Sequence, residues 1–266
     1  MKKSKKLLIG AAISALVVAA VSVALTYSYL VDVDGRNNVI TIGNISLNID
    51  EGSYRDTDIV SQSIVPKSPK VINNGTNDEY VFLRVRVPKE SVTLLYETDT
   101  TVGGQTHKKG EIIDRANSPA LKEIFKIQTD SSPSSPASSQ ITVSGHDDIV
   151  FSYHHGTRNV TTQTEGWYLL TDKNQFDKEI SGKKYDEFYF GYNKRLTPSS
   201  ETKTLFDKIQ LKSFIDEEVN RQVELDVFAY GIQADKLDLS LPEDGSILTV
   251  DQVKSVFAVV ERKQVM

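Results

Sequence analysis

The stretch YVFLRVRV, residues 80–87, alternates apolar residues with aromatic and positively charged ones. The purely apolar series consists of Val81, Leu83, Val85 and Val87. The alternate series consists of Tyr80, Phe82, Arg84 and Arg86. Such a period of two is typical of a β-strand, whose successive side chains point to opposite faces. The stretch therefore predicts a strand with one buried face and one amphipathic face.

The same period recurs along the rest of the chain. Residues 223–229 alternate in the same way, with the apolar series Val223, Leu225, Val227 and Ala229. Further strand candidates are 149–153, 167–170, 187–192 and 205–211. Turn-forming stretches such as NNGTND, residues 73–78, separate them. Many short strands with polar turns predict a mainly β protein, a jelly-roll-like antiparallel β-sandwich that forms a single domain over residues 29–266.

Two short helices are also expected. Ser118 as N-cap and Pro119 at the first helical position, with Leu121, Ile124 and Phe125 on one face, predict a helix near residues 119–127. A C-terminal helix is predicted by a capping box and an apolar stripe. The box pairs Thr249 with Gln252, and the stripe consists of Val253, Val256, Phe257 and Val260. The stretch SSPSSPASS, residues 131–139, predicts a mobile loop because it offers little to bury.

The N-terminus is typical of an export signal. Lys2, Lys3, Lys5 and Lys6 precede an uncharged run from Leu7 to Leu25. Small residues at the end of this run predict cleavage between Ser28 and Tyr29 by a signal peptidase, which makes residues 1–28 a signal peptide. The run approaches the length that spans a bilayer, so an uncleaved membrane anchor is the alternative. In both cases the remainder is expected outside the cell, secreted or at the surface.

Charge and composition exclude several classes of function. The formal net charge is −5, and loss of the four leader lysines lowers it to −9. An acidic exported chain is not expected to bind nucleic acid, which needs a basic surface. The chain has no cysteine, so disulfides, thiolate metal sites and a cysteine nucleophile are excluded.

Four groups of short motifs are similar to those of one family of exported proteins. They are LTYSYL at 25–30 with IGNI at 42–45; NNG at 73–75 with YVFLRV at 80–85; Trp167 with YFGY at 189–192, LTP at 196–198 and LF at 205–206; and AYGIQAD at 229–235. In this combination the chain resembles the TasA/camelysin family of Gram-positive bacteria, whose leaders are removed by a dedicated signal peptidase. The resemblance departs from the family pattern at Ser199, where glycine is usual; the serine favours a type I turn over a left-handed residue.

The resemblance implies a jelly-roll β-sandwich and, for TasA, assembly into biofilm fibres in which the N-terminal strand of one subunit completes the sheet of the next. In this chain the corresponding strand covers residues 29–50. Its alternate-residue anchors are Val39, Thr41, Ile45, Leu47 and Ile49, and Gly43 permits a bulge. A strand at the start of a mature chain is able to pair with its own sheet or with the open edge of a neighbour. Both arrangements are open from sequence.

Candidate metal sites are weak. The acidic stretch DVDG, residues 32–35, lacks the remaining ligands of a calcium loop and is expected to be a solvated turn. Camelysin is classed as a metallopeptidase, but the chain has no HExxH motif. Its four histidines are His107, His146, His154 and His155. The adjacent pair at 154–155 is expected on a strand, where neighbours face opposite ways and do not readily share one zinc.

The sequence therefore predicts a non-enzymatic structural subunit of the extracellular matrix or cell surface, with no cofactor and no catalytic residue. Its expected partners are further copies of itself or a related matrix subunit. The alternatives are a camelysin-like surface metallopeptidase and a membrane-tethered adhesin.

Overall fold

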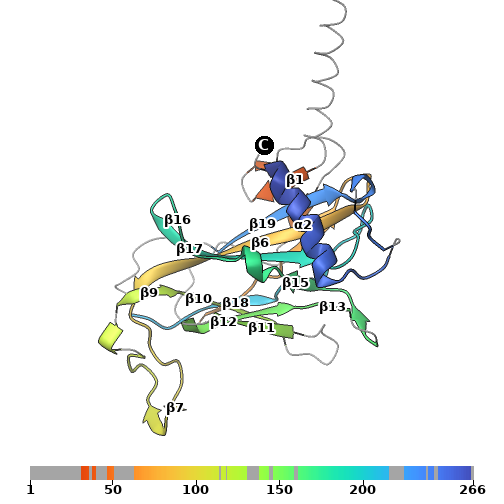
Figure 1. Cartoon of the computed structure of the whole chain (residues 1–266). Helices are drawn as coiled ribbons and strands as arrows, with labels where there is room; N and C mark the ends of the chain where they lie inside the picture. Colours follow the sequence, from red (N-terminus) through yellow and green to blue (C-terminus); the bar gives the residue numbers. More distant parts are fainter. Residues whose placement is uncertain are drawn as a thin grey trace, which may run out of the picture.

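The computed structural model describes most of the chain after the expected leader. The described residues are 31–35, 38–39, 47–50, 63–113, 115–117, 119–130, 138–143, 146–158, 161–215, 225–237, 239–242 and 245–264. They form a mainly β structure with two principal sheets and one C-terminal α-helix (Figure 1). The mainly β class and the two-sheet sandwich predicted from the alternating stretches are confirmed.

The larger sheet is built around the long strand β6 (Glu79–Val92). Its path runs β15 (Trp167–Leu169), β17 (Lys183–Tyr192), β6, β19 (Asp226–Gln233), β1 (Val31–Gly35) and β2 (Asn38–Val39). Two more strands join its ends: β16 (Gln175–Ile180) pairs with β17, and β9 (Ala120–Glu123) pairs with β6. All of these pairings are antiparallel.

The second sheet lies below the first in Figure 1. Its order is β11 (Ser138–Val143), β12 (His146–His154), β10 (Phe125–Gln128), β18 (Lys208–Leu211) and β4 (Ile64–Pro66). The β10–β12 pair is parallel, with Ile127 opposite Phe151. This pair departs from the fully antiparallel arrangement that the sequence predicted.

Smaller elements complete the described structure. Three two-stranded sheets pair β3 (Leu47–Asp50) with β5 (Lys70–Asn73), β7 (Thr100–Val102) with β8 (Gln105–His107), and β13 (Thr157–Arg158) with β14 (Gln163–Thr164). Short 3-10 turns are η1 (Arg115–Asn117), η2 (Thr171–Lys173) and η4 (Ala234–Lys236).

The main core lies between the two sheets. The apolar series of β6, from Val81 to Val87, is fully buried there. Phe151 of β12 lies 5.2 Å from Phe188 and 5.3 Å from Phe190 of β17, measured between ring centroids. The odd-numbered face of β6 therefore packs toward the second sheet, as the period of two predicts.

Helix α2 (Val250–Gln264) covers part of the other face of the larger sheet (Figure 1). The predicted capping box is present: Gln252 N–H donates to Thr249 Oγ1 at 3.3 Å, and Thr249 N–H donates to Gln252 Oε1 at 2.9 Å. The ring of Phe257 packs on that of Phe82 of β6, with 5.0 Å between the ring centroids. Gly191 permits this approach, because a Cβ there would lie 2.3 Å from Val253. The predicted C-terminal helix and its apolar stripe are confirmed.

The helix predicted near 119–127 is wrong. This segment forms β9 and β10 instead. The spacing of Leu121, Ile124 and Phe125 suits a helix, but Phe125 and Ile127 also alternate, and both are buried. Pairing with β6 on one side and β18 on the other overrides the local helical signal.

Three N-terminal and loop expectations also need correction. The predicted strand 29–50 is divided into β1, β2 and β3. The stretch 32–35, expected as a solvated turn, lies within β1 and pairs with β19. The loop predicted over 131–139 ends earlier than expected, because Ser138 and Ser139 begin β11, whereas 131–137 lie outside the described residues.

The turn at Ser199 differs from expectation as well. Ser199 has φ 62°, in the left-handed region that favours glycine. Ser200 N–H donates to Thr197 O at 3.1 Å, and Ser199 N–H donates to Asn73 O at 2.8 Å. These hydrogen bonds fix the turn against the 73–78 stretch, so the tertiary contact outweighs the preference of serine for a right-handed backbone.

Candidate functional site

The inward-facing row of β6 ends in a charged residue. Val85 and Val87 point into the core, and Lys89, two positions further along the same face, is buried as well. On β17 the inward row runs from Phe190 and Phe188 to Asp186. The pairing places Lys89 opposite Lys184 of β17, so Asp186 is its diagonal neighbour on the same face.

A second carboxyl reaches Lys89 from the other side. Glu123 of β9 lies directly opposite Lys89 in the β6–β9 ladder. The side chains of Lys89, Asp186 and Glu123 are 0%, 0% and 1% exposed. We call these three residues the inner cluster. Three strands that meet at one corner of the larger sheet thus place an amine and two carboxyls in the dry interior.

The distances within the inner cluster are short. Lys89 Nζ lies 3.3 Å from Glu123 Oε1 and 3.4 Å from Asp186 Oδ1. It also donates to Asp177 Oδ1 of β16 at 2.6 Å, and that carboxylate is half exposed. The backbone N–H of Asp177 donates to Asp186 Oδ1 at 2.9 Å. Asp186 therefore receives a backbone donor on Oδ1, and its carboxyl also interacts with that of Glu123.

The two inner carboxyls share a proton. Among the described residues, Asp186 Oδ2 and both oxygens of Glu123 are buried and accept no well-aligned hydrogen bond, although Lys89 Nζ lies 3.3 Å from Glu123 Oε1. Burial raises the pKa of Asp186 to about 7, and its hydrogen bond with Glu123 acts in the same direction. Burial also acts to raise the pKa of Glu123, but the hydrogen bond from Asp186 and the charge of Lys89 outweigh it and lower that pKa. The proton thus resides on Asp186.

The next residue of β17 forms a different cluster on the opposite face. Glu187 accepts from Arg86 Nε at 2.5 Å, from Lys178 Nζ at 2.8 Å and from the Tyr189 hydroxyl at 3.1 Å. We call Glu187, Arg86 and Lys178 the outer cluster. Burial acts to raise the pKa of Glu187, but these two cations outweigh burial and lower it. Glu187 is therefore a carboxylate at neutral pH.

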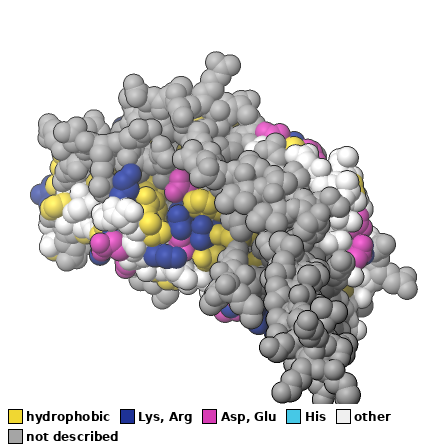
Figure 2. Space-filling view, turned by 90° about the horizontal axis from the view of Figure 1, so that it is seen from above, with side chains coloured by type: hydrophobic (Ala, Val, Ile, Leu, Met, Phe, Trp, Pro, Cys, Tyr) yellow, Lys and Arg dark blue, Asp and Glu magenta, His cyan; other side chains and the backbone are white. Residues whose placement is uncertain are grey.

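Aromatic and cationic side chains continue the outer cluster across the sheet. The guanidinium carbons of Arg84 and Arg86 lie 4.3 Å and 4.6 Å from the centre of the Phe228 ring. Arg84 also lies 5.4 Å from the centre of the Tyr230 ring. Figure 2 shows Lys and Arg side chains next to hydrophobic ones on the described part of this side of the molecule. The amphipathic face predicted for β6 is thus explained by cation–π stacking.

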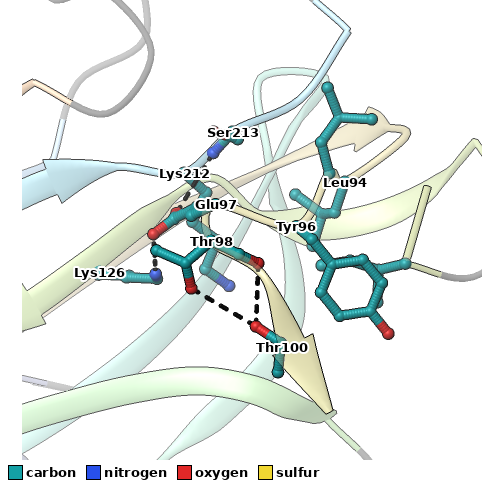
Figure 3. Close-up of a pocket in the computed structure, with 10 residues that line it drawn as sticks. Leu94, Tyr96, Glu97, Thr98, Thr100, Lys126, Lys212 and Ser213 are labelled. Carbon is teal, nitrogen blue, oxygen red and sulfur yellow. Dashed lines mark hydrogen bonds and ion pairs between the residues drawn. The ribbon is translucent and has the colours of Figure 1, made fainter. Parts of the chain in front are cut away.

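A pocket of about 250 Å³ is lined in part by Lys126 of β10 and by Lys212 and Ser213, which follow β18. Lys126 Nζ lies 2.5 Å from Glu97 Oε2. Figure 3 shows this pair in the pocket, with Lys212 and Ser213 beside it. Ser213 N–H donates to Glu97 Oε1 at 3.4 Å. Lys212 is buried and acts electrostatically on Glu123, so one lysine connects the pocket with the inner cluster.

The predicted assembly strand has its own contacts with β19. The β1–β19 ladder runs from Val31 opposite Ile232 to Gly35 opposite Phe228. Leu47 of β3 is 3% exposed and packs on Gly231, where a Cβ would lie 2.6 Å from Leu47 Cδ1. Backbone pairing and one buried anchor thus hold the N-terminal segment on the same strand.

The structure describes only some of the predicted site residues. Leu47 is a buried anchor and Ile49 is partly buried against the same core. Val39 lies in β2, paired with Asp34. Thr41 and Ile45 lie outside the described residues, as do Gly43 and the predicted cleavage site at Ser28 and Tyr29.

The histidines are distributed over the structure. His154 is buried and lies 2.7 Å from Asp207 through Nε2. His155 pairs with Trp167 through an isolated parallel β-bridge of the backbone. The ring of His107 stacks on that of Tyr96, with 4.7 Å between ring centroids. His146 begins β12. Among the described residues, no group of three His, Asp or Glu side chains is placed to hold a metal ion. In the same part of the chain, no helix has the length and apolar character to cross a membrane.

The inner cluster was not predicted from the sequence, although a signal was present. Lys89 continues the apolar series Val81 to Val87 by one more step of two, and Asp186 precedes Phe188 by the same step. A charged residue in the register of a buried row indicates a buried charge. Its partner Glu123 fell in the segment that was predicted as helix.

Comparisons of the chain with protein-family models, with characterised proteins and with solved structures found no match. The resemblance to the TasA/camelysin family therefore stays a prediction from the motifs.

Proposed function

We propose that the chain is an exported structural subunit of the cell surface or extracellular matrix, and that copies associate by exchange of the N-terminal strand. The observation that supports this most is the β1–β19 ladder, which extends over five residue pairs. If β1 is withdrawn, the backbone groups of β19 between Phe228 and Ile232 lose these partners on that side. A strand edge of this kind pairs with any extended chain of suitable register, including the β1 of another copy.

The position of β1 in the chain supports the same proposal. After cleavage between Ser28 and Tyr29, β1 begins two residues from the new N-terminus. It is then tethered to its own domain on one side only, so it is able to leave together with β2, and exchange of the segment through Leu47 also opens the β3–β5 pair. Leu47 makes the pairing specific for this segment, because its side chain packs directly on Gly231. A Cβ at position 231 would occupy the space that the leucine side chain fills.

The experiment compares the mature chain starting at Tyr29 with a truncated chain starting at Asp50. We expect the mature chain to form fibres visible by electron microscopy, because each β1 pairs with the β19 of the next copy. We expect the truncated chain to remain monomeric with a β-rich circular dichroism spectrum. A synthetic peptide of residues 29–49 should bind the truncated chain and block its incorporation into fibres of the mature chain.

Two point variants provide the matched control. Leu47→Asp places a charge in the buried seat and should abolish fibres. Val102→Asp makes the same chemical change at a side chain that is 55% exposed, and it should leave the fibres unchanged. If the mature chain stays monomeric at high concentration and the truncated chain is unfolded, the strand belongs to its own sheet and the proposal is wrong.

A further inference from the structure

The inner cluster contains the components of a condensation reaction. Lys89 provides an amine, Asp186 an un-ionised carboxyl, and Glu123 a carboxylate that contacts both. All three side chains are excluded from water. An acid that is already protonated is a much better acyl group than a carboxylate, because attack on it does not place a second negative charge on the same group.

We propose that Lys89 Nζ and the Asp186 carboxyl condense to an intramolecular amide that joins β6 to β17, with Glu123 as the proton acceptor. This amide would lie inside the sandwich, and its formation does not depend on how copies associate. The chain has no cysteine, so a disulfide cannot cross-link its strands. An amide between side chains would supply a covalent link of another kind.

The proton steps are balanced within the cluster. The Lys89 ammonium gives one proton to Glu123 across 3.3 Å and becomes a neutral amine. The amine attacks Asp186 Cγ, so that an N–C bond forms. The Cγ–Oδ2 bond breaks and the hydroxyl leaves as water, taking a second proton from the nitrogen through Glu123. Glu123 ends protonated, the total charge is unchanged, and no oxidant or reductant is needed.

The backbone assists the attack. The N–H of Asp177 donates to Asp186 Oδ1 at 2.9 Å, where negative charge develops in the tetrahedral intermediate. β17 and β6 hold the two reacting groups in place, since Lys89 Nζ already lies 3.4 Å from Asp186 Oδ1. The fold thus provides proximity, an oxyanion donor and a base.

One feature of the cluster opposes the reaction. Burial acts to lower the pKa of Lys89, but the hydrogen bond to Asp177 and the nearby carboxyls outweigh burial and raise it. The amine is therefore mostly charged, so condensation should be slow. A maturation step that occurs once per molecule tolerates a slow rate.

Asp177 is nearer to Lys89 but is a poor acyl group. Its side chain is 51% exposed, so water stabilises the carboxylate against attack. The outer cluster gives a second comparison: Lys178 lies 2.8 Å from Glu187, a carboxyl that stays ionised. Contact between a lysine and an acid is thus not sufficient, and no link is expected at either of these acids.

Tryptic peptide mapping of the purified full-length or mature chain tests the proposal. The protein is incubated at pH 7, denatured and digested. Trypsin does not cut at an acylated lysine, so Lys89 should remain inside the peptide 87–108. We expect this peptide joined to 185–194, which contains Asp186, with the mass of one water molecule missing. The three candidate acids fall in different tryptic peptides, because Glu123 lies in 123–126 and Asp177 in 174–178.

Variants separate the reaction from folding. Asp186→Ala should abolish the linked peptide, and Glu123→Gln should reduce it severalfold or more at the same incubation time. Asp177→Ala should retain the link, because its backbone N–H remains. Fluorescence of buried Trp167 reports in each case whether the variant is folded.

The wild-type chain decides the outcome even if a variant fails to fold. Folded wild-type protein that yields 185–194 only as a free peptide, with cleavage after Lys89, would overturn the proposal. A link to 123–126 or 174–178 would overturn the assignment of Asp186 as the acyl group.

Discussion

Asp186 and Glu187 are adjacent on β17, and the side chains of both are 0% exposed, yet their pKa values move in opposite directions. Asp186 faces the core and shares its surroundings with a second carboxyl and Lys89. Glu187 faces outward, and its carboxylate accepts hydrogen bonds from Arg86, Lys178 and the Tyr189 hydroxyl. Burial acts to raise the pKa of both groups, and the two cations at Glu187 reverse the direction there, whereas the second carboxyl at Asp186 reinforces it.

The outer and inner clusters use a buried charge in different ways. The outer cluster pairs a carboxylate with two cations and stabilises the sheet through ion pairs between neighbouring strands. The inner cluster brings together two acids, of which one is neutral, beside an amine. In the inner cluster the same β-sheet geometry that pairs strands also aligns reactive groups.

The largest expected effect comes from removal of the lysine on each face. Lys89→Met leaves Glu123 in the interior without the cation that contacts it and removes any amide, so we expect a loss of about 3–5 kcal/mol in the free energy of unfolding. Lys178→Met removes a side chain that is one-third exposed, and Arg86 remains to pair with Glu187. This change should cost at most about 1 kcal/mol. Urea denaturation at pH 7 measures both values.

Equal losses for the two lysine variants would contradict the distinction between the clusters. Lys184→Met in β17 serves as a control, because Lys184 lies opposite Lys89 in the β6–β17 ladder but is exposed. It should change the unfolding free energy by no more than about 0.5 kcal/mol.

A smaller effect is expected at Glu187, and it depends on pH. The folded-state pKa of Glu187 lies below its ordinary value of 4.5, so its stabilising contribution is present above pH 4.5 and is lost as the pH falls through the folded pKa. Glu187→Gln should therefore cost about 1–3 kcal/mol at pH 7. The difference between variant and wild type should shrink as the pH falls below 4.5. Urea denaturation over a pH series measures this, and a difference that stays constant would be contradictory.

The period of two predicted the sandwich because it reports which face of a strand is buried. The series Val81 to Val87 identified the central strand and its inward face, and the Thr249–Gln252 pair identified the start of α2. These signals are local, so they can be recognised in the sequence without knowledge of which strands are neighbours.

Other features depended on contacts between distant segments. The spacing of Leu121, Ile124 and Phe125 fits a helix equally well, and only pairing with β6 and β18 made the segment two strands. Ser199 takes a left-handed backbone because hydrogen bonds to Asn73 hold its turn. The inner cluster required the registers of β9 and β17 on β6, which no local pattern specifies.

The opposite charge states of Asp186 and Glu187 are tested most directly by ¹³C NMR of their side-chain carboxyl carbons as a function of pH. Asp186→Asn and Glu187→Gln assign the two signals. At pH 6 we expect Glu187 to give a carboxylate signal. Asp186 should give no carboxylate signal at that pH, since its pKa of about 7 keeps it protonated or its carboxyl has become the amide with Lys89. A wild-type Asp186 carboxyl that titrates below pH 4.5 together with Glu187 would contradict both the shared proton and the amide.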